Sequence, residues 1–182
     1  MKTWIILSLL MASSVFGSDK LGVIQATTQR HGYAETSTVE VSLISGDGSQ
    51  KSHVKIELQG RLTNSKGNAS VLKNRDSTIV GFNIRQGVGI YGMSLVAIRK
   101  NGSLSVIRNL EEVIGKQMKQ IDIALNPQSL LLDKINGNSL RFKYTGEEVS
   151  PNYFDVYASV VDGNIEVDRE RLKGSIPRED KK

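Results

Sequence analysis

The sequence predicts an all-β fold of mainly antiparallel strands, arranged as a single β-sandwich with at most one or two short helices; a small closed β-barrel is the alternative. Runs of alternating apolar and polar residues recur about every ten to fifteen positions, as is typical of half-buried strands. Turn residues separate these runs. The chain has no cysteine, so an exported domain of this sequence depends on its apolar core rather than on disulfides.

The first seventeen residues, MKTWIILSLLMASSVFG, have the pattern of a secretory signal peptide. Lys2 precedes an apolar run that is too short for the roughly 20 residues of a membrane-spanning helix. We expect residues 1–17 to be the signal peptide, residues 18–168 the β-sandwich domain and residues 169–182 a charged, flexible tail. The expected location is the periplasm or the cell surface of a bacterium, with secretion as the alternative.

Two hairpins are predicted from alternation and turn residues. Val39, Val41 and Leu43 share one face of the first run, and the loop SGDGSQ joins it to a second run, SHVKIELQ. Asn101 and Gly102 lie between the apolar runs of MSLVAIRKNGSLSVIR, and an Asn-Gly pair in this setting is a strong hairpin signal.

Two stretches depart from the strand pattern. The segment NLEEVIGKQMKQI predicts a short helix, with Asn109 as the N-cap and with Glu111 and Glu112 in the first turn, where carboxylates favour the helix dipole. The stretch from Asn126 to Gly137 is compatible with either a helix or a strand, and the sequence leaves this open.

Residues 87–92 read GVGIYG, which has the G-x-G-x-x-G spacing of a dinucleotide-binding turn. That fingerprint needs a helix after the glycines, because the helix N-terminus receives the pyrophosphate. The residues that follow predict a hairpin instead. We therefore interpret GVGIYG as a tight turn or bulge and expect no bound nucleotide.

Catalytic motifs are scarce. His31 and His53 lack the spacing of a zinc site, and no G-x-S-x-G occurs. We expect no enzymatic activity, no metal site and no cofactor, although a hydrolase with a dispersed site around His31 and Tyr33 remains an alternative. The glycine and glutamate that a calcium loop requires are missing between Asp162 and Asp168. The sequence leaves open whether the carboxylates of this segment form a weak calcium site.

Charge is unevenly distributed along the chain. The segment between Gln50 and Leu110 carries a net charge of +8, whereas the whole chain carries +5. Basic residues on neighbouring strands would form a positive surface. The candidate binding residues are Lys51, Lys55, Arg61, Lys73, Arg75, Arg85, Arg99 and Tyr91.

The sequence therefore favours an exported, non-catalytic binding module whose partner is an anionic surface or an acidic macromolecule, such as an acidic glycan, lipid headgroups or an acidic protein. Peripheral contact with a membrane is compatible with this hypothesis, whereas nucleic acid is not expected. The alternative is a structural subunit of a periplasmic or surface assembly that pairs through a sheet edge. The oligomeric state is not determined by the sequence.

Overall fold

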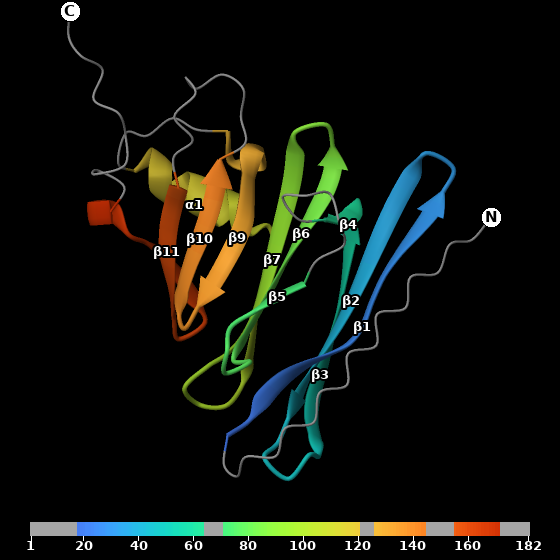
Figure 1. The fold of residues 1–182 in the computed structure, drawn as a ribbon, viewed down its shortest axis with the longest axis vertical. Helices are drawn as coiled ribbons and strands as arrows, with labels where there is room; N and C mark the ends of the chain where they lie inside the picture. Colours follow the sequence, from blue (N-terminus) through green and yellow to red (C-terminus); the bar gives the residue numbers. More distant parts are fainter. Residues whose placement is uncertain (1–17, 64–70, 121–125, 145–154, 172–182) are drawn as a thin grey trace, which may run out of the picture.

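The described residues form three antiparallel sheets arranged in layers, with an α-helix beside the last sheet (Figure 1). This computed structural model describes residues 18–63, 71–120, 126–144 and 155–171. The N-terminal sheet has the order β1-β2-β3. Its strands are β1 (Lys20–His31), β2 (Ala34–Ile44) and β3 (Gln50–Gln59).

The central sheet has the order β4-β6-β7-β8, and β5 also pairs with β6. Its strands are β4 (Arg61–Thr63), β5 (Val71–Lys73), β6 (Ile79–Gly87), β7 (Ile90–Ile98) and β8 (Leu104–Ile107). Gly60 alone separates β3 from β4, so the chain passes directly from the N-terminal sheet into the central sheet.

The C-terminal sheet has the order β12-β11-β10-β9. Its strands are β9 (Leu130–Asn136), β10 (Ser139–Tyr144), β11 (Asp155–Val161) and β12 (Asn164–Val167). Between the central and C-terminal sheets the chain forms α1 (Leu110–Lys119) and a short 3-10 helix, η1 (Pro127–Ser129).

The central sheet is buried on both faces. One face packs on the N-terminal sheet, and that core includes Val39, Val41, Ile56, Val80, Phe82 and Ile84. The opposite face packs on the C-terminal sheet and on α1, and that core includes Ile79, Met93, Leu95, Ile114, Leu132 and Phe142. Because alternate residues of β6 and β7 serve different cores, these strands are apolar on both sides rather than half polar.

The all-β prediction is confirmed, and the described strands form open sheets rather than a closed barrel. Both predicted hairpins are present, as β2–β3 and β7–β8. The predicted helix is α1, with Asn109 in the N-cap position, but the Asn109 side chain makes no capping hydrogen bond. The open stretch from Asn126 to Gly137 contains η1 followed by β9.

Side-chain amides cap both edges of the C-terminal sheet. Asn83 of β6 donates from Nδ2 to the Leu132 carbonyl at 2.8 Å and accepts from the Leu132 N–H at 2.9 Å. Gln117 of α1 binds β12 in the same way, donating to the Ile165 carbonyl at 2.7 Å and accepting from the Val167 N–H at 2.8 Å. Each amide takes the place of a neighbouring strand, so these edges cannot extend there by pairing with another strand.

Candidate functional site

The segment GVGIYG spans the turn between β6 and β7, with Val88 and Gly89 in the turn itself. Gly89 has a φ of 69°, in the left-handed region that favours glycine, and a bulge lies between Arg85 and Gly87. The residues after the turn form strand β7, so no helix N-terminus follows these glycines. The predicted structural role of the glycines is confirmed.

Strand pairing beside this turn places three of the candidate binding residues in one row. Arg85 on β6 pairs directly with Arg61 on β4 and with Tyr91 on β7. Directly paired residues of antiparallel strands project from the same face of a sheet. The two arginines and the tyrosine therefore share a face at the end of the central sheet, across three adjacent strands.

Arg61 and Arg85 also line a pocket of about 280 Å³. Its remaining lining residues are Glu35, Thr63, Gln86, Gly87 and Val88. Glu35 comes from β2, and its carbonyl accepts a hydrogen bond from the Gly60 N–H at 2.7 Å. The pocket thus lies between the end of the N-terminal sheet and the β6–β7 turn. These segments are far apart in the sequence, so the sequence did not predict that they share a pocket.

Two positive charges face one negative charge in this pocket. Arg61 and Arg85 form no ion pair with Glu35 or with any other carboxylate in the described parts of the chain. Arg85 Nε donates to the Gly87 carbonyl at 3.1 Å. This hydrogen bond holds the guanidinium against the β6–β7 turn and leaves its Nη groups available to a ligand. Like charges placed directly opposite each other on a sheet repel, so this pair favours an anion between them.

The other candidate basic residues do not join this pocket. Lys73 pairs with Val80, five residues before Arg85 on β6, which corresponds to about 17 Å along the strand. Arg75 follows Lys73 in the next turn, and Arg99 follows the end of β7 at the same end of the sheet. Lys73, Arg75 and Arg99 are therefore separated from the Arg61–Arg85 pair.

Two further lysines already have acidic partners. Lys51 Nζ lies 2.9 Å from Asp19 Oδ1, and Lys55 Nζ lies 2.8 Å from Glu57 Oε1. These contacts offset the positive charge of β3. Of the eight candidate residues, only Arg61, Arg85 and Tyr91 form one cluster.

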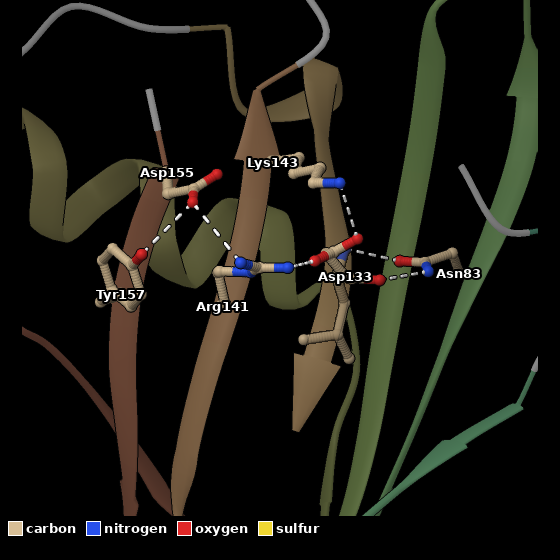
Figure 2. Close-up of polar contacts among 7 residues, drawn as sticks. Asn83, Asp133, Arg141, Lys143, Asp155 and Tyr157 are labelled. Carbon is tan, nitrogen blue, oxygen red and sulfur yellow. Dashed lines mark hydrogen bonds and ion pairs between the residues drawn. The ribbon is translucent and has the colours of Figure 1, made fainter. Parts of the chain in front are cut away.

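A second polar cluster lies on the outer face of the C-terminal sheet (Figure 2). Asp133 of β9 accepts hydrogen bonds from Arg141 and from Lys143 of β10, the latter at 3.1 Å. Arg141 also lies 3.9 Å from Asp155 of β11, which accepts a hydrogen bond from the Tyr157 hydroxyl at 3.2 Å. The sequence left open whether Asp133 lies on a helix or a strand, and it gave no indication that these residues form a network.

This outer-face cluster is internally paired, so it offers no free charge to a ligand. Burial alone would raise the pKa of Asp133, but the hydrogen bonds from Arg141 and Lys143 outweigh it and hold the pKa below its usual value. Arg171 stacks over the Tyr157 ring, 3.5 Å from the centroid. The arrangement is that of a structural ion-pair network.

Glu111 is the buried carboxylate of α1. Its Oε2 accepts a hydrogen bond from the Met93 N–H at 2.7 Å. Strand β8 ends at Ile107, which pairs with Leu95, so the carboxylate serves as partner for a β7 N–H beyond the end of β8. Burial raises the pKa of Glu111. The sequence indicated a helix-dipole role for this residue but not its contact with β7.

Other titratable side chains of the described residues lie apart from the clusters above. His53 lies 3.4 Å from Glu40, and both are on the surface of the N-terminal sheet. The Asp162 carboxylate accepts a hydrogen bond from the Lys100 N–H at 3.0 Å in the β11–β12 turn. Within the described ranges no three histidine or carboxylate side chains are grouped to hold a metal ion.

No protein-family model matches this chain. No curated protein matches it either. No solved structure matches it. Among the residues that the structure describes, none of the helices has the length and apolar character needed to cross a membrane.

Proposed function

We propose that this protein is an exported, non-catalytic binding module that holds an anionic group between Arg61 and Arg85. The observation that carries the proposal is the direct pairing of these arginines across β4 and β6, on the wall of one pocket and without an ion-pair partner in the described chain. A phosphate, sulfate or carboxylate group fits this chemistry, because guanidinium groups bind such planar or tetrahedral oxyanions through paired hydrogen bonds.

Repulsion between the arginines supports a ligand role over a structural one. Opposed like charges destabilise a sheet by about 0.2–1 kcal/mol, and Glu35 supplies one negative charge for two positive charges. A bound anion would remove this repulsion. The repulsion in the free protein would thus become part of the binding free energy.

Apolar side chains beside the pocket favour an amphipathic partner. Val88, which lines the pocket, is 89% exposed at the tip of the β6–β7 turn, and Ile90 follows it at 39%. Valine and isoleucine would enter the headgroup region of a membrane while the arginines bind its phosphates. An anionic lipid surface therefore fits this end of the molecule better than a fully hydrated polysaccharide.

The test compares two charge-matched double variants. Arg61→Ala with Arg85→Ala removes the pair, whereas Lys73→Ala with Arg75→Ala removes the same charge from the other end of the central sheet. Binding is measured by cosedimentation with vesicles of phosphatidylcholine and phosphatidylglycerol, and by retention on heparin. We expect the first variant to lose at least about tenfold in affinity and the second to bind like the wild type.

The salt dependence of binding shows whether the attraction is electrostatic, and substitutions in the apolar turn distinguish a lipid surface from a polysaccharide as the source of the anion. Wild-type binding must weaken as salt rises, because an electrostatic attraction is screened. Val88→Ser with Ile90→Ser should reduce vesicle binding and leave heparin retention unchanged if the partner is a lipid surface. Equal losses in the two double charge variants, or binding that does not respond to salt, would show that Arg61 and Arg85 form no specific site.

A further inference from the structure

Strand β3 is the edge of the N-terminal sheet. It pairs with β2 on one side, and no strand in the described part of the chain pairs with its other side. From Ser52 to Gln59 the register with β2 is unbroken, because the bulge of this hairpin lies nearer the loop. The strand therefore presents eight consecutive residues as a regular edge.

Hydrogen-bond alternation shows which backbone groups point outward. His31 and Ala34 close the two-residue turn between β1 and β2, which makes them a hydrogen-bonded pair. At the other side of β2, the Gly60 N–H donates to the Glu35 carbonyl. Both observations give the same alternation, in which Val54, Ile56 and Leu58 bond to β2. The outward N–H and C=O groups belong to His53, Lys55, Glu57 and Gln59.

Some outward backbone groups of β9, β12 and β1 already have hydrogen-bond partners, whereas the outward groups of β3 have none in the described part of the chain. The Asn83 and Gln117 amides occupy the edges of β9 and β12. Strand β1 contains a bulge at Ile24, and its Leu21 N–H donates to the Ser77 carbonyl. Strand β3 has no proline and no charged residue on its inward face, which are two common means of protecting an edge.

We propose that β3 pairs antiparallel with β3 of a second copy of this chain, with Ile56 opposite Ile56 at the two-fold axis. In this register the outward backbone groups of Lys55 meet those of Glu57 in the second copy, so the strands form hydrogen-bonded pairs. Two N-terminal sheets then join into one six-stranded sheet. The proposal is independent of the Arg61–Arg85 site.

Side-chain charge selects this register. Lys55 and Glu57 are exposed neighbours on the outer face, and pairing about Ile56 places each lysine opposite a glutamate of the other copy. A shift of one residue in the axis brings Lys55 opposite Lys55 or Glu57 opposite Glu57, and opposed like charges are unfavourable. On the inner face, Val54 meets Leu58, so apolar residues are also matched.

Charge reversal tests the pairing without disturbing the core. The oligomeric state is measured by sedimentation across a concentration series for the wild type, Lys55→Glu, Glu57→Lys, the double swap, and an equal mixture of the two single variants. We expect a wild-type dimer, a dissociation constant raised about tenfold in each single variant, and recovery in both the double swap and the mixture. A wild type that stays monomeric at every concentration, or single variants that dimerise like the wild type, would overturn the proposal.

Amide exchange provides a second, position-specific readout. In the monomer the Val54 and Ile56 amides are protected by β2, whereas the Lys55 and Glu57 amides face solvent. Dimerisation should slow exchange at Lys55 and Glu57 as protein concentration rises. A dimer in which these two amides still exchange rapidly would rule out β3 as its interface.

Discussion

Asn83 on β6 and Leu132 on β9 are joined by two hydrogen bonds, so that one buried side-chain amide completes the edge of a neighbouring sheet. The central and C-terminal sheets are therefore joined by a polar contact as well as by their shared apolar core. Neither backbone group of Leu132 would find water at this position, because both residues are fully buried.

Removal of this amide should be costly. Asn83→Ala leaves the Leu132 N–H and C=O without partners, and we expect a loss of about 3 kcal/mol in the free energy of unfolding. Asn136→Ala, at an exposed position of β9, is the control and should change stability by less than about 0.5 kcal/mol. Urea unfolding measures both. Equal stabilities for the two variants would mean that the hydrogen bonds between Asn83 and Leu132 contribute nothing to the free energy of unfolding.

Glu111 should make the protein less stable as pH rises. Burial raises its folded pKa above the usual 4.5, so the folded state binds more protons than the unfolded state between these two values. Stability contributed by the protonated carboxyl is present below pH 4.5 and is lost as pH rises through the raised folded value. Glu111→Gln keeps an acceptor for the Met93 N–H and removes the charge.

We therefore expect Glu111→Gln to gain stability over the wild type as pH increases from 4 to 8. Glu112→Gln, its exposed neighbour in the same helical turn, is the matched control. Chemical unfolding at a series of pH values tests this. A difference between Glu111→Gln and the wild type that is independent of pH would contradict the assignment.

Asp133 should have the opposite pH dependence. Hydrogen bonds from Arg141 and Lys143 hold its folded pKa below the usual 3.8 despite its burial. The stability contributed by this carboxylate is therefore present above pH 3.8 and is lost as pH falls through the lowered folded value. Asp133→Asn should cost about 1 kcal/mol at neutral pH and nothing at the most acidic pH at which the protein remains folded. A constant cost across the acid range would show that the ion pairs are not responsible.

The glycines of GVGIYG should differ in their tolerance of alanine. Gly89 has a positive φ, so Gly89→Ala should lose about 1 kcal/mol. A Cβ at Gly87 would meet only ordinary van der Waals contacts with Ile90, so Gly87→Ala should retain wild-type stability. Thermal unfolding of the two variants tests this contrast. A larger loss from Gly87→Ala than from Gly89→Ala would contradict the turn geometry.

Local patterns in the sequence predicted part of the local structure. Alternation and turn residues predicted the β2–β3 and β7–β8 hairpins correctly, whereas the sequence did not decide between helix and strand for the stretch that contains β9. The third sheet follows from contacts between distant segments, which alternation does not encode. Strands β6 and β7 are apolar on both faces because each face belongs to a different core, and a run of this kind carries no information about which strands cover it.

The candidate site was only partly predictable for the same reason. Net charge drew attention to the segment that contains Arg61 and Arg85, but strand register decided that these two pair and that Lys73 lies at the other end of the sheet. The hydrogen bonds between Asn83 and Leu132 could not be predicted, because the two residues are separated by 49 positions in the sequence. Glu35 enters the pocket from another sheet altogether.

Arginine side-chain NMR tests most directly whether Arg61 and Arg85 bind one anion together. The Nε–Hε resonances are assigned by single substitution to lysine, and inorganic phosphate is titrated at constant ionic strength. We expect the Arg61 and Arg85 resonances to shift together with one dissociation constant, while those of Arg75 and Arg99 remain in place. Absence of any shift, or equal shifts at all four arginines, would contradict a shared anion site.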